Sequence, residues 1–174
     1  MNGKTIVSLL VVTLIAASFL GCGYALVGRS SNLPEDVRSI YVETLRNQTG
    51  RSQVDQIVTR ALVQEFVSRQ RFQVVGNLAE ADAILSGTIL SYRVSPVAFL
   101  EGRARQYQVQ IGAKMEFKRT GSDEVIWRQD NYLFRETYEA EISETAFFSR
   151  EDEKLEDTAE RFAETVVIDL LEGF

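Results

Sequence analysis

Residues that could carry catalysis are scarce in this chain of 174 residues, which has one cysteine and no histidine. Without histidine there is no Ser-His-Asp triad, no Cys-His pair and no side chain whose ordinary pKa lies near neutrality. Histidine-ligated zinc is excluded for the same reason, and one cysteine cannot form an internal disulfide. We therefore predict no catalytic residues, no metal and no cofactor.

The single cysteine, Cys22, follows a segment typical of a secretory signal. Lys4 comes first, an apolar run follows from residue 6, and Gly21 directly precedes the cysteine. The stretch at 6–20 is shorter than the ~20 residues that span a bilayer as a helix. The arrangement resembles a bacterial lipobox, so we expect a lipoprotein signal peptide at 1–21, acylation of Cys22 and a lipidated linker at 22–38. The alternative is a secreted protein with a stray thiol.

Charge is distributed unevenly along the chain. Residues 22–135 hold 15 basic and 12 acidic side chains, whereas residues 136–174 hold 3 basic and 13 acidic ones. Such a chain is a poor general ligand for nucleic acid, although local basic patches could still hold an anion. Arginine supplies 15 of the 19 basic residues, which favours forked contacts with phosphate or carboxylate, unless it only reflects genome composition.

Two places combine arginine with exposed apolar residues. The segment at 95–105 is predicted to be a loop between strands, with Phe99 and Leu100 beside Arg103 and Arg105. That mixture suits an amphiphile with an anionic head, and a loop with two solvated arginines is the alternative. The second place is Arg150, where a helix begins after two phenylalanines, since a helix N-terminus beside an arginine favours an anionic group.

Elements that must position these residues follow from apolar periodicity. Strands are predicted at 39–45, 72–75, 83–94, 106–118 and 124–137, and the fourth alternates apolar and polar residues almost perfectly. Apolar spacings of 3 and 4 predict helices at 52–69, capped by Ser52, and from about Ser149 to the C-terminus. Gly87 inside a strand indicates a bulge or a close approach. The fold expected is α+β: a two-layer sandwich with two helices on one face of a mixed or mostly antiparallel sheet of four to five strands.

The carboxylate run at 151–157 has the composition of a cation site or an acid/base pair. It occupies the first turns of the last predicted helix, where the helix dipole favours negative side chains, and its spacing lacks the EF-hand pattern. A solvated helix N-terminus is the simpler interpretation. The chain has no phosphate-binding glycine motif such as GxGxxG or GxxxxGK[ST].

Several segments together resemble the LptE family of lipopolysaccharide-assembly lipoproteins. They are the start CGYALVG at 22–28, Leu33-Pro34, IYVETLRNQT at 40–49, EADAILSG at 80–87 and the strand around Tyr107. The resemblance covers nearly all of the chain after Cys22 and makes residues 39–174 a single LptE-like domain. It implies two helices on a four-stranded sheet and no enzymatic activity.

The resemblance also implies partners and site residues. A family member sits inside the β-barrel of LptD as a plug, and the pair delivers lipopolysaccharide to the outer leaflet. Basic residues on loops at one end of the sheet bind lipopolysaccharide, which here implies Arg103, Arg105 and Arg150. Phe99, Phe134 and Arg135 are candidates for contact with the barrel, and packing in the core is the alternative for Phe134. With Gly23 after the cysteine instead of aspartate, the resemblance favours lipid anchoring to the periplasmic side of the outer membrane.

Two other functions stay open on the sequence. A periplasm-facing adaptor or carrier lipoprotein for another acyl or peptide ligand would have an exposed sheet edge or an apolar groove. A cell-wall hydrolase would need two converging, buried acids in a cleft.

Overall fold

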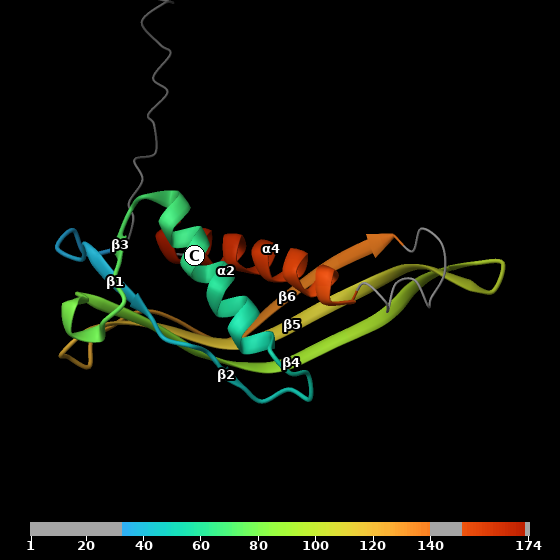
Figure 1. The fold of residues 1–174 in the computed structure, drawn as a ribbon, viewed down its shortest axis with the longest axis horizontal. Helices are drawn as coiled ribbons and strands as arrows, with labels where there is room; N and C mark the ends of the chain where they lie inside the picture. The colour runs from blue at the N-terminus through green and yellow to red at the C-terminus, as the bar shows by residue number, and fades with distance from the viewer. Residues whose placement is uncertain (1–32, 140–150, 173–174) are drawn as a thin grey trace, which may run out of the picture. The chain divides into compact units, whose positions relative to one another are not determined.

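The computed structural model describes residues 33–139 and 151–172. They form two layers, in which helices α2 (Val54–Arg69) and α4 (Glu151–Glu172) cover one face of a six-stranded sheet (Figure 1). The predicted two-layer α+β fold is confirmed. The strand expected at 39–45 is two shorter strands, β1 (Ser39–Val42) and β2 (Arg46–Asn47), so the sheet has one strand more than expected.

The sheet is mixed, with short parallel strands on one side and a long antiparallel meander on the other. Strand order is β3-β1-β4-β5-β6, and β2 pairs separately with β4. Strand β1 is parallel to both β3 (Gln73–Val74) and β4, and β2 is also parallel to β4, while β5 is antiparallel to both β4 and β6. The meander consists of β4 (Ala83–Leu100), β5 (Arg103–Arg119) and β6 (Val125–Glu139), preceded by the short helix η2 (Leu78–Glu80).

The turn before helix α2 is closed by Asn47. Its side-chain oxygen accepts a hydrogen bond from the backbone N–H of Thr49 at 2.8 Å, and its amide nitrogen donates to the carbonyl oxygen of Arg51 at 2.8 Å. The residue before the helix is Gln53, in the left-handed region with φ 66°, and no side chain caps the helix. The predicted cap at Ser52 is wrong, because the chain enters the helix through Gln53 one residue later.

Strand β5 shows which face of the sheet is buried in the hydrophobic core. Its six residues expected to face the core are all at most 1% exposed: Tyr107, Val109, Ile111, Ala113, Met115 and Phe117. The apolar stripe predicted for the last helix is likewise buried: Leu155, Ala159, Phe162, Ala163, Val166 and Leu170. Both patterns are confirmed, since side chains two apart on a strand and three or four apart on a helix share a face.

Gly87 marks a close approach rather than a bulge. A Cβ atom there would lie 2.6 Å from the carbonyl oxygen of Lys114 and 2.7 Å from the sulfur of Met115. Only a residue without a side chain fits this distance. The nearest register shift lies farther along β4, between Ile89 and Ser91.

The loop predicted at 95–105 is wrong, because β4 and β5 continue through it as paired strands. Strand β6 ends at Glu139, opposite Gln106, and beyond that point β4 and β5 form a hairpin that is two-stranded as far as the described residues show. We call residues 95–106 the arm and the helix-covered remainder the body; the arm extends past the end of α4 (Figure 1). Pro96 indicated a loop, but proline is tolerated in a strand at a bulge, and the register shifts directly after it.

Candidate functional site

The tip of the arm is a two-residue turn. Leu100 pairs with Arg103, and the two residues between them, Glu101 and Gly102, have φ of 51° and 77°. Positive φ at both central positions is the signature of the type I′ turn, whose twist matches that of the flanking strands. The turn therefore lets the hairpin run straight to its end and holds the residues beside it at the surface.

Apolar side chains are exposed along the arm. Phe99 is 65% exposed, Leu100 58% and Val97 47%, and Phe99 has the highest value of any large apolar residue in the described part of the chain. Burying such side chains against a ligand is favourable, by ~25 cal/mol per Å² of apolar surface. A group of exposed apolar residues on one hairpin marks a binding surface.

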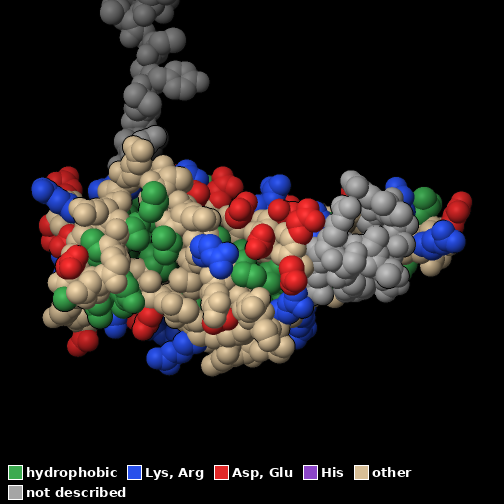
Figure 2. Space-filling model, in the orientation of Figure 1, with side chains coloured by type: hydrophobic (Ala, Val, Ile, Leu, Met, Phe, Trp, Pro, Cys, Tyr) green, Lys and Arg blue, Asp and Glu red, His purple; other side chains and the backbone are tan. Residues whose placement is uncertain are grey.

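Two arginines accompany these residues. Arg103 pairs across the hairpin with Leu100, and Arg105 is the extra residue at the register shift between Ala98 and Phe99. Both are exposed, and within the described residues neither forms an ion pair. Figure 2 shows basic and apolar side chains together at the far end of the molecule. The arm thus offers guanidinium forks for an anionic head and apolar surface for acyl chains.

The base of the arm is fixed to helix α4 through Tyr138 on β6. The Tyr138 hydroxyl lies 2.8 Å from Thr158 Oγ1, and Thr158 itself donates to the carbonyl oxygen of Lys154 at 2.6 Å, so Tyr138 is the donor. Partial burial raises the pKa of Tyr138, which keeps its proton available for this bond. The Lys154 ammonium lies 4.9 Å from the centre of the Tyr138 ring. These contacts set the direction in which the strands leave the body.

The residues expected to contact a partner are separated in the structure. Phe99 lies on the arm, whereas the Phe134 ring is 5.9 Å from that of Phe162 and belongs to the core between β6 and α4. Arg135 is exposed on β6, opposite Gln110 of β5. The structure does not bring these three side chains together.

Two other expected residues, Cys22 and Arg150, lie outside the described residues, as does the predicted helix start at Ser149. The signal peptide at 1–21 and most of the linker at 22–38 lie outside them as well. Within the described residues, no helix is long and apolar enough to cross a membrane.

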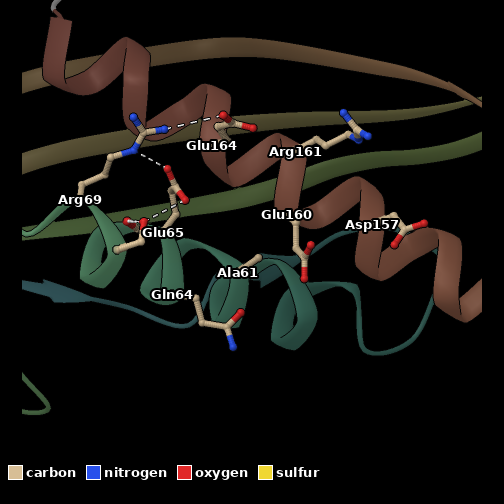
Figure 3. A pocket seen from close by; sticks show the side chains of 9 residues that line it. Ala61, Gln64, Glu65, Arg69, Asp157, Glu160, Arg161 and Glu164 are labelled. Atoms are coloured by element: carbon tan, nitrogen blue, oxygen red, sulfur yellow. Dashed lines mark hydrogen bonds and ion pairs between the residues drawn. The ribbon is translucent and has the colours of Figure 1, made fainter.

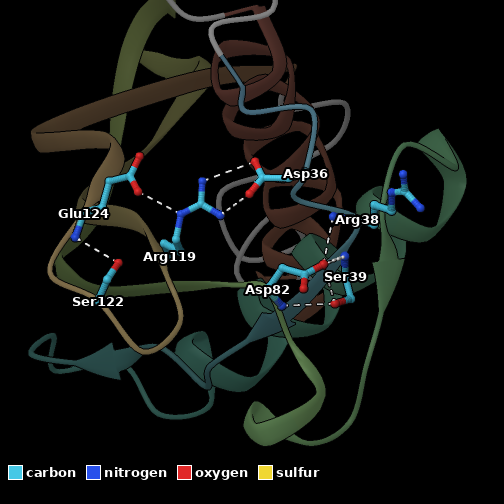
Figure 4. A network of polar contacts seen from close by, with 7 residues as sticks. All are labelled: Asp36, Arg38, Ser39, Asp82, Arg119, Ser122 and Glu124. Carbon is cyan, nitrogen blue, oxygen red and sulfur yellow. Dashed lines mark hydrogen bonds and ion pairs between the residues drawn. The ribbon is translucent and has the colours of Figure 1, made fainter.

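At the opposite end of the sheet, a polar cluster fastens the first described residues to the strands (Figure 4). Asp82 accepts hydrogen bonds from the backbone N–H groups of Arg38 and Ser39 at 2.9 and 2.8 Å, and these bonds hold its pKa below the ordinary value. Arg119 forms a fork to Asp36, with distances of 2.6 and 3.3 Å, which lowers the pKa of that carboxyl. Both carboxylates are therefore engaged in tying segments of the fold together.

A groove of about 850 Å³ runs between helices α2 and α4 (Figure 3). Its lining is mostly charged, and Arg69 lies between Glu65 at 2.5 Å and Glu164 at 3.8 Å. The carboxylates and guanidinium satisfy one another at the surface, where such pairs contribute ~0–1 kcal/mol. The groove is a charged surface groove open to solvent between the two helices, and it lacks the apolar walls of a ligand pocket.

The hydrolase alternative requires two converging, buried acids in a cleft, which can be looked for among the described residues. None of their carboxylate side chains is buried, so the buried acid pair is not found there. Within the same residues, no three acidic or cysteine side chains are grouped so that they could hold a metal ion.

Comparison with protein families gives one match, to LptE, described as lipopolysaccharide assembly, over residues 37–170. The chain belongs to the LptE family. The match begins just before β1 and ends within α4, so it includes the whole sheet, the arm, helix α2 and all but the last two residues of α4. No curated protein matches this LptE-family sequence closely enough to serve as a relative.

Solved structures share the fold of this LptE-family chain at low identity. Uncharacterized lipoprotein B from Nitrosomonas europaea has a TM-score of 0.52 at 15% identity, with 86% of this chain and 90% of that chain covered. Hypothetical protein CT253 from Chlamydia trachomatis has a TM-score of 0.54 at 7% identity, with 79% of this chain and 97% of that chain covered. A minor lipoprotein from Acinetobacter baumannii has a TM-score of 0.52 at 7% identity, with 80% of this chain and 95% of that chain covered. At these identities the likeness concerns the fold alone.

Sequence analysis missed Asp82 and Arg119, which build the cluster of Figure 4. Arg38 and Ser39 are 44 and 43 positions from Asp82, and Asp36 is 83 positions from Arg119, so no local spacing indicates the contacts. The available signal was Asp82 between Ala81 and Ala83, a carboxylate directly before a strand that begins with three apolar residues.

Proposed function

We propose that this protein is an outer-membrane lipoprotein that plugs and stabilises an LptD-like β-barrel and helps deliver lipopolysaccharide to the outer leaflet. The observation that carries the proposal is the LptE family match across the folded domain, together with an arm that presents exposed arginines beside exposed apolar residues. Acylation of Cys22 would hold the domain on the periplasmic side of the membrane. Two acyl signals anchor a protein stably where one does not.

The proposal assigns separate tasks to the residues. Arg103, Arg105 and Arg150 would contact lipopolysaccharide phosphates, and Phe99 would contact either the acyl chains or the barrel wall. Phe134 supports the strand from within the core, because its ring packs on Phe162. No residue is given a catalytic task, since binding and positioning suffice for this role.

The experiment that tests this function is purification of the protein from outer membranes under mild detergent. We expect the endogenous barrel partner to co-purify, the mature N-terminus to be acylated at Cys22 by mass spectrometry, and depletion to reduce surface lipopolysaccharide. A Cys22→Ala variant should leave the folded domain intact but detach it from the membrane. Recovery of the protein alone, with surface lipopolysaccharide unaffected by depletion, would contradict the proposal.

One observation favours a second function, that of an adaptor lipoprotein for an extended peptide. Strand β6 is the last strand of the sheet, and no strand in the described part of the chain pairs with its outer edge. An open edge of this kind accepts a peptide as an added strand. Recovery of a peptide or a non-barrel protein in the same purification would support the adaptor function over the plug.

A further inference from the structure

The outer side of strand β4 loses its strand partners part-way along. Strand β1 pairs with β4 at 83–85, and β2 pairs with it at Thr88 and Ile89. The last backbone contact on this side comes from the N–H of Gln48, which donates to the carbonyl oxygen of Ile89 at 2.9 Å. Over residues 90–100, no strand in the described part of the chain pairs with this side of β4 (Figure 1). We call this stretch the β4 edge.

Exposed apolar side chains are concentrated on the β4 edge. The described residues include eight exposed large apolar side chains, and four of them lie here: Leu90, Val97, Phe99 and Leu100. Unpaired backbone groups beside exposed apolar side chains are a template for another strand, and native sheets usually protect such edges with charge. The other open edge strand, β6, has five charged residues, whereas the β4 edge has only Arg93. The β4 edge is therefore the less protected of the two.

The two faces of the sheet beside the β4 edge differ in polarity. On the core face, Tyr92 and Val94 pack against a small cluster that contains the buried Val109. Strand side chains alternate between faces, and the register is regular from 91 to 96, so Arg93 and Ser95 project from the opposite face. A strand added to this edge would follow the same alternation. Its apolar residues would lie beside Tyr92 and Val94, and its polar residues beside Arg93.

The charge of this region indicates which polar residues such a strand would carry. Arg93 is exposed and forms no ion pair within the described residues. Arg103 and Arg105 add positive charge nearby, against a single carboxylate at Glu101 within residues 90–105. Opposite charges on directly facing residues of neighbouring strands attract, and like charges repel. The complementary strand is therefore acidic on the face of Arg93.

We propose that the β4 edge binds, as an added strand, an extended segment of a partner protein in which apolar residues alternate with acidic ones. Backbone hydrogen bonds supply the affinity in this mode of recognition, and the alternate side chains supply the specificity. Strand β2 shows that the same side of β4 accepts a strand, since it pairs there directly before Leu90. Pro96 has no N–H to donate, so we expect the most regular ladder over residues 90–95. The proposal requires neither lipopolysaccharide nor acylation of Cys22.

The test uses the mature chain in detergent micelles and a synthetic peptide of about ten residues that alternates valine with glutamate. Anisotropy of the labelled peptide measures affinity, and hydrogen–deuterium exchange locates the contact. We expect the peptide to protect backbone amides within 90–100 and to leave those of β6, at 125–139, unchanged. A peptide with the same side chains but an N-methyl group on every backbone nitrogen should bind about tenfold or more weakly, because it cannot donate to the edge.

Reversing one charge tests the proposed alternation. Arg93→Glu should weaken binding of the valine–glutamate peptide by about threefold to tenfold, because a facing attraction becomes a repulsion. A peptide with lysine in place of glutamate should bind this variant more tightly than it binds the unaltered protein. Arg60→Glu is the matched control, since Arg60 is exposed on α2 and forms no ion pair within the described residues, and it should leave both affinities unchanged. Equal effects of the two substitutions would show that only net charge matters and would overturn the proposal.

Other results would place a different occupant on the β4 edge or none. Peptide-induced protection of β6 would assign the added strand to the other open edge, as in the adaptor function. Protection of residues 90–100 that grows with protein concentration, without peptide, would identify a second copy of this chain as the occupant. Equal binding of the N-methylated peptide or of a scrambled peptide of the same composition, or no binding by the unaltered protein, would also refute the proposal. Co-purification of the barrel partner and surface lipopolysaccharide are separate readouts, so the proposed function stands or fails independently.

Discussion

The same residue types have different roles in the body and in the arm. In the body, phenylalanines such as Phe162 are buried, and several arginines are paired, as Arg119 is with Asp36 and Glu124. In the arm, Phe99 is exposed and Arg103 has no ion pair among the described residues. The buried and ion-paired side chains of the body hold the fold together, whereas the exposed side chains of the arm are available for a ligand.

This difference separates stability from binding in a way that mutations can test. Changes to the buried or ion-paired side chains of the body should lower the free energy of unfolding and leave intrinsic ligand affinity unaltered while the protein is folded. Changes in the arm should alter affinity with little effect on unfolding, because exposed substitutions usually change stability by less than ~0.5 kcal/mol.

The largest expected contrast is between two phenylalanines. Phe162→Ala should lower the free energy of unfolding by about 3–5 kcal/mol, since it removes a fully buried ring that contacts Tyr132 and Phe134. Phe99→Ala in the arm should change it by less than about 0.5 kcal/mol. Urea unfolding followed by circular dichroism measures both, and similar losses for the two variants would refute the division into body and arm.

Two glycines sharpen the comparison through different physical causes. Gly87→Ala in the body should cost about 1–3 kcal/mol, because the new methyl group would lie 2.6 Å from a backbone carbonyl oxygen that is fixed in the sheet. Gly102→Ala at the tip meets no atom within 4 Å and should cost only about 1 kcal/mol, through its positive φ. Thermal denaturation of both variants would show whether crowding in the body outweighs strain in the arm.

The Asn47 side chain makes a smaller contribution to the stability of the body. Asn47→Ala removes the bonds to Thr49 and Arg51 and should cost about 1–2 kcal/mol, because part-buried backbone groups lose partners. Asn131→Ala, at an exposed position on β6, is the control and should be nearly neutral. An equal effect of the two changes in chemical denaturation would show that the turn is not held by the asparagine.

Lowering the pH should reduce the stability of the body, and this is the smallest of the expected effects because the carboxylates concerned lie at the surface. Hydrogen bonds from Arg38 and Ser39 lower the pKa of Asp82, and the Arg119 fork lowers that of Asp36. Their stabilisation is therefore present above the ordinary aspartate pKa of about 4 and is lost as pH falls through the lower folded values. Asp82→Asn should flatten the acid side of a plot of melting temperature against pH, whereas Asp123→Asn should not.

The body is predictable from sequence because its patterns are local and repeated. The alternation of β5 and the stripe of α4 each place six residues in the core, and all of them are buried. Periodicity of this kind follows directly from strand and helix geometry. The cap at Ser52 failed because the turn is closed by a side chain five positions earlier and the helix begins after a left-handed residue.

The sequence indicates the arm as a candidate site but not as paired strands. Pro96 and Gly102 are usual loop residues, and the pairing depends on two register shifts and a non-glycine residue, Glu101, with positive φ. The cross-strand pairing of Arg93 with Gln110 and of Gln110 with Arg135 is not visible in the sequence either, because these residues come from three strands. Cross-strand register joins residues far apart in sequence, and no spacing within one segment encodes it.

The most direct test of the central claim is binding of lipopolysaccharide by the Arg103→Glu, Arg105→Glu variant, with unfolding measured on the same preparation. Arg46→Glu with Arg60→Glu in the body serves as the control of equal charge. The account predicts a loss of lipopolysaccharide affinity of about tenfold or more at low salt in the arm variant alone, with its urea midpoint unchanged. Unchanged affinity in the arm variant, or an equal loss in the body variant, would contradict the assignment of binding to the arm.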